Sequence, residues 1–238
     1  MPGSAEPGQT FGRVAEAYGR TRPSYSPDVI ERAAHELGLT REATVLDLAA
    51  GTGNLTRALR DRFAHVIAVE PDAGMRAQFR GDVLAGTAES IPLDDGTVDA
   101  VFVGEAFHWF DPEPALEEIG RVSSGLAIVA RSWGEMEQPG LLPPPFWAEL
   151  SEIWRRFHGD VNRDDFPDWR DTVKPKGPAR FEETVRISGR DLADLQLTGS
   201  TPASIPDDER AAIAERAYPL MDDWYEMRVV TELYWLRF

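Results

Sequence analysis

Two carboxylates and two glycines around one short turn are the residues of this sequence best suited to chemistry. Asp47 ends a short apolar run, Gly51 and Gly53 follow it, and Glu70 stands nineteen residues after Gly51. Glycines at such a place permit a tight turn and let the backbone approach a ligand. An acidic residue about 20 positions further on typically binds the hydroxyls of a ribose. Together these features favour a nucleoside-containing cofactor, and the alternative is an ordinary strand–turn–helix with a solvated glutamate.

The residues near this turn distinguish between two nucleoside cofactors. A dinucleotide fingerprint requires a third small residue, and the β-branched, polar Thr56 occupies that position. Asp47 would also repel a pyrophosphate. S-adenosylmethionine has no phosphate, and its ammonium group needs a hydrogen-bond acceptor such as a carboxylate. The residues therefore favour S-adenosylmethionine, and an NAD-dependent oxidoreductase is the less favoured alternative.

The cofactor turn requires a scaffold, and the surrounding sequence predicts alternating strands and helices. Amphipathic helices are predicted at residues 54–63, 72–80 and 112–122. Short apolar runs between and beside them predict strands at residues 44–48, 65–69, 82–85, 98–103 and 126–131. This alternation is typical of a parallel sheet with helices on both faces.

The pattern changes after Trp133. A proline-rich break occupies residues 139–145. Beyond it the sequence predicts helices at 146–157 and 207–220 and strands at 180–187 and 227–238. We expect the two strands to form a hairpin that completes the sheet.

The chain before the first strand is predicted to contain three parts. Residues 1–10 are polar and rich in Gly and Pro, which predicts a disordered tail. Residues 11–20 have apolar residues at helical spacing, and Ser26 with Pro27 begins a second helix that ends near Leu37. Nothing in the sheet pattern requires residues 11–25, so we expect them to form a lid over the cofactor. The competing interpretation is that they pack on the outer helices.

The segment from Asp47 to Gly53 closely resembles the first motif of the class I S-adenosylmethionine-dependent methyltransferases. Later segments resemble further motifs of that family in the same order, namely residues 69–75, 86–93, 98–101 and 105–111. The resemblance implies transfer of a methyl group from S-adenosylmethionine to a small-molecule acceptor, with S-adenosylhomocysteine as the product.

Two features are similar to the subgroup named for trans-aconitate methyltransferase. These are the Phe-His-Trp-Phe sequence of residues 107–110 and the N-terminal segment 11–25. The resemblance is strong over residues 11–133 and weaker over residues 180–238.

The pattern and the resemblance together predict one α/β domain over residues 11–238. Its Rossmann-like, mostly parallel sheet is expected to have seven strands, with helices on both faces and an N-terminal helical lid. Residues 11–40 would form the N-terminal cover, residues 41–133 the cofactor-binding core, and residues 134–238 the substrate-side elements and closing strands.

The resemblance also implies roles for matched positions. Asp47, Gly51 and Gly53 would hold the methionine portion of the cofactor, and Glu70 the ribose. Further cofactor contacts are implied for Ala49, Asp72, Met75, Ala88, Glu89 and Glu105. Two positions depart from the family. Ala49 stands where many members have glycine, and residues 121–125 replace a Pro-Gly-Gly turn with a shorter one. Neither change removes a group that would bind the cofactor.

Residues 104–110 follow a predicted strand directly. Ligands of open α/β sheets bind beyond the carboxyl ends of the strands, so this segment should face the methyl donor. His108 is the best candidate for a general base, because the unperturbed pKa of histidine lies near neutrality. The alternative is that His108 packs structurally or touches the cofactor. A base is needed only if the acceptor must lose a proton.

Aromatic and cationic residues are candidates for the acceptor pocket and its lid. Phe107, Trp109 and Trp133 either line an apolar pocket or pack in the core. Tyr18, Arg22 and Tyr25 are placed to close over the site. Arg22 would hold an anionic group of the acceptor or be a solvated cation at a helix end.

Composition disfavours several other functions. The net charge of −16 repels phosphate backbones and anionic lipids, so nucleic-acid and membrane partners are not expected. The sequence has no cysteine, and its histidines lack the spacing of a metal site, so no metal is predicted. No signal peptide and no apolar run of about 20 residues is found, so a cytoplasmic location is expected. A protein of the methyltransferase fold that uses the cofactor for cyclisation or regulation remains an alternative.

Overall fold

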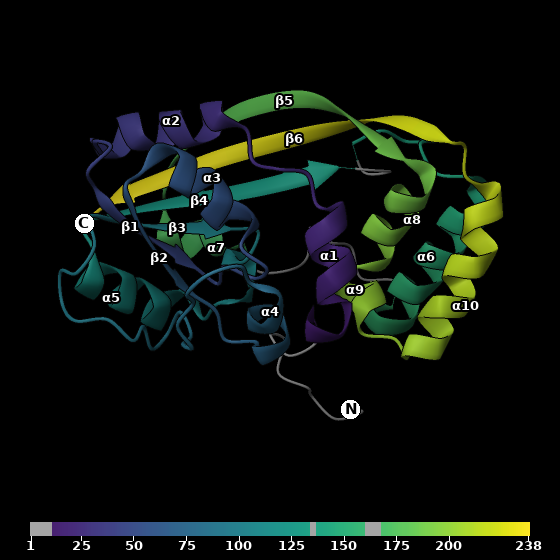
Figure 1. Ribbon diagram of the computed structural model, residues 1–238, viewed down its shortest axis with the longest axis horizontal. Coiled ribbons are helices and arrows are strands. Elements are labelled where there is room, and N and C mark those ends of the chain that lie inside the picture. The colour runs from purple at the N-terminus through teal and green to yellow at the C-terminus, as the bar shows by residue number, and fades with distance from the viewer. Residues whose placement is uncertain (1–10, 134–136, 160–167) are drawn as a thin grey trace.

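A single mixed sheet organises the computed structural model, which describes residues 11–133, 137–159 and 168–238 (Figure 1). The sheet has six strands in the order β2-β1-β3-β4-β6-β5. The strands are β1 (Thr44–Leu48), β2 (His65–Val69), β3 (Ala100–Gly104), β4 (Gly125–Trp133), β5 (Lys176–Ser188) and β6 (Trp224–Arg237). β1 to β4 run parallel, whereas β6 is antiparallel to both β4 and β5. The predicted parallel sheet and its closing antiparallel pair are confirmed.

Helices connect the strands and extend beyond them. The α-helices of the first half are α1 (Ala15–Thr21), α2 (Pro27–Leu37), α3 (Asn54–Arg62), α4 (Ala73–Gln78) and α5 (Pro112–Val122). Those of the second half are α6 (Pro144–His158), α7 (Trp169–Val173), α8 (Gly189–Leu197), α9 (Ser200–Ala203) and α10 (Asp207–Ala217). Short 3-10 helices are η2 (Phe11–Val14), η3 (Phe107–Trp109) and η6 (Tyr218–Leu220). Among the described residues, no helix is both long and apolar enough to cross a bilayer.

The strand predicted at residues 82–85 does not form. Leu84 makes one isolated parallel bridge with Val69, through Leu84 N to Ala68 O at 2.9 Å and Glu70 N to Leu84 O at 3.0 Å. Leu84 is 41% exposed, so little apolar burial stabilises a longer strand pairing at this edge of the sheet. The described part of the chain therefore has six strands rather than the seven predicted.

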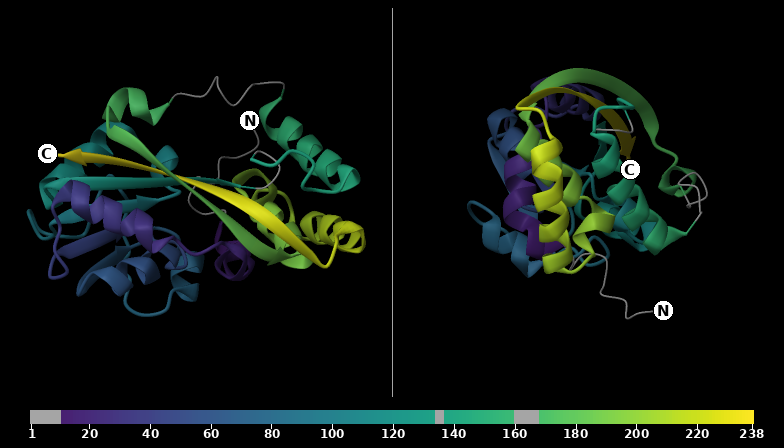
Figure 2. Two further views of the ribbon diagram at one scale, coloured as in Figure 1. Left: turned by 90° about the horizontal axis from the view of Figure 1, so that it is seen from above. Right: turned by 90° about the vertical axis from the view of Figure 1, so that its right-hand side faces the viewer.

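The C-terminal half contains helices that the sequence analysis did not predict. One of them, α8, is capped by Ser188, whose hydroxyl accepts a hydrogen bond from Asp191 N at 3.1 Å. A Ser three residues before an Asp is a recognisable start signal for a helix. The strands β5 and β6 are also longer than predicted, and they extend past the parallel strands to reach α8 and α10 (Figures 1 and 2).

The buried side chains form three clusters. One cluster lies between the sheet and helices α2 and α3, and a second lies on the opposite face against α5 and α7. The third cluster joins α6, α8 and α10 to the far ends of β5 and β6. The molecule therefore has a two-faced sheet core and a helical group at one end, with α1 located where the two meet (Figure 1).

The N-terminal segment packs closely on α4 and on the turn before α3. A Cβ atom added to Gly74 of α4 would lie 2.6 Å from the Cα atom of Gly12. A Cβ atom added to Gly19 would lie 3.1 Å from the Thr52 hydroxyl oxygen. On its other side, Arg20 forms ion pairs with Asp191 and Asp194 of α8. Residues 11–21 thus connect the sheet core to the helical group.

Candidate functional site

A cavity of about 500 Å³ lies beyond the carboxyl ends of β1, β2 and β3. This is the edge at which open α/β sheets bind their ligands. The cavity is within the usual size range of small-molecule sites. Nine of the predicted site residues line it, namely Tyr18, Ala49, Gly51, Glu70, Met75, Ala88, Glu89, Glu105 and Trp109.

The turn after β1 depends on backbone conformations that favour glycine. Gly51 and Gly53 have φ angles of 58° and 84°. A Cβ atom on Gly53 would lie 2.8 Å from the Phe79 ring, so this position excludes larger residues. Ala49 also has a positive φ angle, of 58°, which is unfavourable for a residue with a Cβ atom. The alanine at this position therefore strains the turn, although the turn keeps its shape.

Glu70, directly after β2, connects this turn to the end of that strand by hydrogen bonds. One carboxylate oxygen accepts a hydrogen bond from Gly51 N at 2.7 Å, and the other accepts one from Asp72 N at 2.8 Å. Burial raises the pKa of the Glu70 carboxyl above its ordinary value. A carboxylate has about four acceptor positions, so Glu70 can still accept hydrogen bonds from a ligand hydroxyl in the cavity.

Asp47 is the most deeply buried acid of the site, with a relative exposure of 1%. One oxygen accepts a hydrogen bond from the Thr56 hydroxyl, and the other, Oδ1, has no partner. Burial raises the pKa of Asp47 to about 7. An unpartnered buried carboxylate oxygen fits a cationic ligand group, because such a group would compensate the lost solvation.

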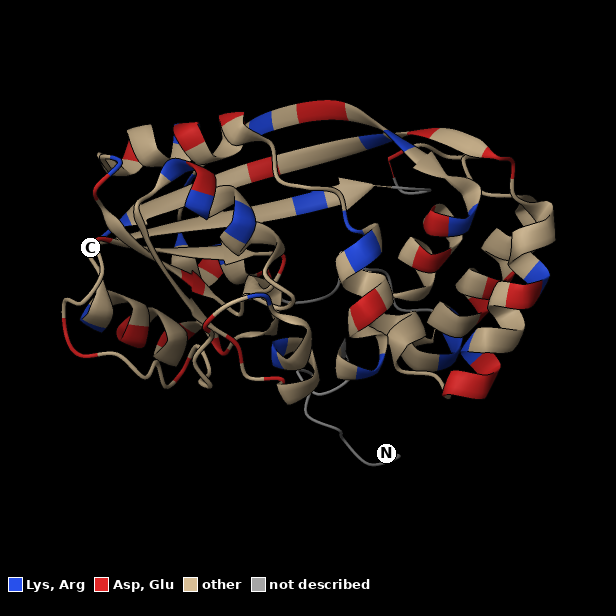
Figure 3. Cartoon of the chain, viewed as in Figure 1, with Lys and Arg blue, Asp and Glu red and all other residues tan. Residues whose placement is uncertain are grey.

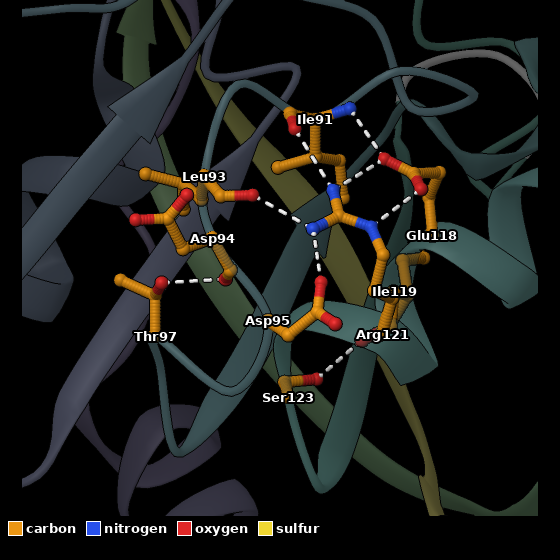
Figure 4. A network of polar contacts seen from close by, with 9 residues as sticks. All are labelled: Ile91, Leu93, Asp94, Asp95, Thr97, Glu118, Ile119, Arg121 and Ser123. Carbon is orange, nitrogen blue, oxygen red and sulfur yellow. Dashed lines mark hydrogen bonds and ion pairs between the residues drawn. The ribbon is translucent and has the colours of Figure 1, made fainter.

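The loop formed by residues 87–95 forms another wall of the cavity, and an arginine fixes it. Arg121 donates to Ile91 O at 3.0 Å and to Leu93 O at 2.8 Å, and it is paired with Glu118 (Figure 4). Glu118 also accepts a hydrogen bond from Ile91 N at 2.9 Å. Arg121 was expected only as part of a shortened turn. The structure shows that it holds the loop bearing Ala88 against α5.

Met75 forms a further part of the cavity wall, and Asp72 holds it in position. Asp72 caps α4, because its carboxylate accepts a hydrogen bond from Met75 N at 2.9 Å. Met75 is buried and lines the cavity, whereas Asp72 lies behind it. The cap therefore fixes the position of the methionine at the wall.

Glu105 lies where β3 ends, again with a positive φ angle, of 61°. Its carboxylate accepts a hydrogen bond from the backbone N–H of Arg131 and lies 4.0 Å from the Arg131 side chain. Burial raises the pKa of Glu105, although the cationic Arg131 opposes this shift. Trp109 and Phe110 follow along the cavity wall, so this end of the cavity is partly aromatic.

Several predicted residues lie away from the cavity wall. His108 is exposed as a residue and its ring contacts the Trp109 ring, with centroids 4.8 Å apart. Desolvation of the imidazole lowers the pKa of His108 below its ordinary value. Phe107 is buried in the core against Phe110 and Trp169. The role of His108 as a base therefore stays a prediction, and Phe107 serves packing.

Two arginines beside the cavity, Arg22 and Arg131, pack against aromatic rings of the predicted lid. The Arg22 guanidinium lies 4.4 Å from the Tyr18 ring centroid and 4.9 Å from that of Trp133. Arg22 also donates to Thr198 O at 3.2 Å, so it is not simply a solvated helix-end cation. The Arg131 guanidinium lies 3.8 Å from the Tyr25 ring centroid. Arg131 was missed by the sequence analysis, because a single cation at the end of a strand carries no local signal.

Comparison with known proteins agrees with this geometry. Residues 46–129 match the family described as "Methyltransferase domain". An uncharacterized methyltransferase of Mycobacterium tuberculosis is 46% identical over 221 residues, which cover 89% of this chain and 85% of the relative. A malonyl-[acyl-carrier protein] O-methyltransferase of Pectobacterium atrosepticum is 32% identical over 168 residues, covering 66% of this chain and 61% of that protein.

The fold has a counterpart among solved structures. A protein of Anaeromyxobacter dehalogenans, provisionally assigned as a type II methyltransferase, matches with a TM-score of 0.59 and 19% identity. The match covers 91% of this chain and 97% of the other. With the sequence relatives and the cavity beyond the sheet, it leads to one conclusion: the chain belongs to the class I S-adenosylmethionine-dependent methyltransferases and is an enzyme of that family.

Proposed function

We propose that this enzyme transfers the methyl group of S-adenosylmethionine to a small-molecule acceptor, and that it belongs to the trans-aconitate methyltransferase-like subgroup. The observation that carries the proposal is the composition of the cavity beyond the carboxyl ends of β1, β2 and β3. Its lining includes Gly51 of the glycine turn, the buried carboxylate of Glu70, and the rings of Trp109 and Phe110. The buried carboxylate of Asp47 lines a small adjoining cavity that shares Gly51. The larger cavity suits a polar cofactor on one side and a partly apolar acceptor on the other.

The residues around the glycine turn fit the cofactor. Asp47 offers an unpartnered oxygen to a cation, and Glu70 has acceptor capacity left for ribose hydroxyls. Met75 and Ala88 provide apolar surface for the adenine. When bound, the cofactor supplies an electrophilic methyl group on a sulfonium. The protein contributes by holding the acceptor in line with this methyl group and by excluding water.

A small acceptor agrees with the charge of the molecule. Acidic residues outnumber basic residues by 41 to 25. In Figure 3 the acidic and basic residues are interspersed along the outer helices and along β5 and β6. This distribution opposes an extended polyanion such as nucleic acid.

We further propose that residues 11–25 act as a cover that becomes more ordered when the cofactor binds. Tyr18 lines the cavity directly. Pro23 O accepts a hydrogen bond at 2.8 Å from the side chain of Asn54, the first residue of α3. The cover therefore contacts the turn that would hold the cofactor, and closing it would shield the site from water.

Ligand binding tests the proposed cofactor. We expect calorimetry to detect binding of S-adenosylmethionine and S-adenosylhomocysteine but not of NAD. Glu70→Ala should weaken the binding of S-adenosylmethionine and of S-adenosylhomocysteine by about 1–3 kcal/mol, because it leaves buried donors and the ribose hydroxyls without their acceptor. Glu117→Ala, which removes an exposed acid from α5, is the matched control. Tight binding of NAD alone would refute the assignment. If the protein bound the cofactor but transferred its labelled methyl group to no member of a broad acceptor panel, the cyclase or regulator alternative would be favoured.

A second prediction concerns the cost of burying Asp47. Its pKa is raised in the folded protein, so ionised Asp47 destabilises the fold as the pH rises from about 4 through 7. The full shift corresponds to at most about 4 kcal/mol. We expect Asp47→Asn to increase the free energy of unfolding, and to do so by on the order of 2 kcal/mol more at pH 8 than at pH 5. Urea denaturation at the two pH values measures this difference. The same substitution should weaken the binding of S-adenosylhomocysteine.

The matched control for this prediction is Asp61→Asn, which changes an exposed aspartate on α3. Its effect on stability should be small at both pH values. If Asp47→Asn destabilised the protein equally at pH 5 and pH 8, the buried carboxylate would have a structural role instead.

Hydrogen exchange tests the cover. S-adenosylhomocysteine should slow amide exchange across residues 11–25. Gly74→Ala should reduce that protection, because the added methyl group would collide with the backbone at Gly12. Gly120→Ala is the control, since its new Cβ atom would make only an ordinary contact of 3.4 Å with the Phe238 ring. Exchange in residues 11–25 that does not respond to the ligand would contradict the proposed cover.

A further inference from the structure

The last strand of the sheet, β5, leaves one long edge without a partner strand. β5 extends over 13 residues and, within the described part of the chain, pairs with β6 alone. It lies along the upper rim of the molecule in Figure 1 and is uncovered when seen from above in Figure 2. Such a strand is about twice the usual length. Its outer N–H and C=O groups form a template for pairing with another strand.

The two ends of β5 limit the segment that can pair. Pro178 has no backbone N–H to donate, and the register with β6 is irregular next to it. At the other end the strand stops at Ser188, which caps α8. The regular part of the free edge therefore extends from about residue 180 to residue 188, and Thr184 lies at its middle.

The side chains of this segment alternate between two faces of the sheet. The exposed face carries Arg180, Glu182, Thr184 and Arg186, and the residues between them are buried or half-buried. A second copy of the strand would continue the sheet with its own exposed side chains on the same face. Each exposed residue of one copy must therefore lie opposite an exposed residue of the other.

Two copies of β5 match in charge when they pair antiparallel about Thr184. Glu182 of one copy then lies opposite Arg186 of the other, and symmetry repeats this pair on the other side of the centre. On the more buried face, Phe181 lies opposite Ile187. Opposite-charge and apolar cross-strand pairs both stabilise antiparallel sheets.

The neighbouring registers lose this match. A pairing centred on Glu183 would place Arg180 opposite Arg186 and Glu183 opposite itself. A pairing centred on Val185 would leave no charged residue opposite a residue of opposite charge. Charges on an edge strand usually oppose pairing. Here they oppose the neighbouring registers and favour the register centred at the middle of the free edge.

Both charged groups are available to a partner strand. Arg186 lies over the Trp224 ring, 4.4 Å from its centroid, and forms no ion pair with any described residue. Glu182 is 49% exposed in its side chain and lies 3.1 Å from Arg180 and 3.9 Å from Arg228. Exposed ion pairs of this kind contribute little to stability, so they do not prevent Glu182 from binding a further guanidinium.

We propose that β5 pairs with β5 of a second copy of this chain, antiparallel and centred on Thr184, so that two six-stranded sheets become one continuous sheet. The proposal does not depend on the proposed function. The cofactor cavity lies beyond β1, β2 and β3, and β4 and β6 separate those strands from this edge. The pairing therefore leaves the cavity accessible.

Light scattering after gel filtration tests the proposal through the mass of the protein. We expect the wild-type chain to be a dimer at about 100 µM and to dissociate on dilution. Glu182→Arg and Arg186→Glu should each raise the dissociation constant roughly 10- to 100-fold, because each places like charges opposite one another at two symmetric positions. Glu117→Arg makes the same change in charge on α5 and should leave the dissociation constant unchanged.

Two combinations of these variants separate a specific pairing from a folding defect. The double variant E182R/R186E reverses both charges of each pair and should restore the dimer. An equimolar mixture of the two single variants should form a heterodimer, because every arginine at these positions then lies opposite a glutamate.

Three results would overturn the proposal. A wild-type chain that is monomeric up to about 100 µM would show that the charges only protect the edge from pairing. A dimer that neither single variant weakens would have its interface elsewhere. Single variants that dissociate but do not associate when mixed would exclude the register centred on Thr184.

Discussion

The buried carboxylate of Asp47 is the constraint on which the site depends. A negative charge at the end of a central strand is costly, and the protein offsets only part of that cost with the Thr56 hydroxyl. A second buried acid, Glu70, raises the pKa of Asp47 further through like-charge repulsion. The glycine turn lies between them in the chain, and Glu70 binds its backbone. The free protein therefore keeps an arrangement that a ligand with cationic and hydroxyl groups would stabilise.

Elements distant in the sequence hold this arrangement in place. Arg121 fixes the loop on one side of the cavity, and Asp72 caps the short helix on another. Arg131 of β4 connects the end of β3 to the N-terminal segment by contacting Glu105 and Pro23. Because residues 11–21 also pair with α8, the cofactor turn and the helical group are joined through one segment. Movement of that segment would therefore affect both the cofactor turn and the helical group.

Local patterns were sufficient to predict much of this structure. The glycines, Asp47 and Glu70 lie within 24 residues, and each position follows from the turn chemistry of one strand–helix unit. Residues 82–85 were predicted wrongly, because a short apolar run does not show that its edge of the sheet is exposed. Arg131 could not be found in this way, since its partner Pro23 is 108 residues away. The Phe-His-Trp-Phe sequence was identified, yet only the structure separates the buried Phe107 from the exposed His108.

The most direct test of the central claim counts the protons exchanged when S-adenosylhomocysteine binds at pH 7. Calorimetry in two buffers with different ionisation enthalpies gives this number. With a pKa of about 7, Asp47 is partly protonated in the free protein, and a bound ammonium group would lower that pKa. The account predicts net release of up to about half a proton per ligand, which is lost in Asp47→Asn. No release, or the same release in the Asp47→Asn variant, would contradict it.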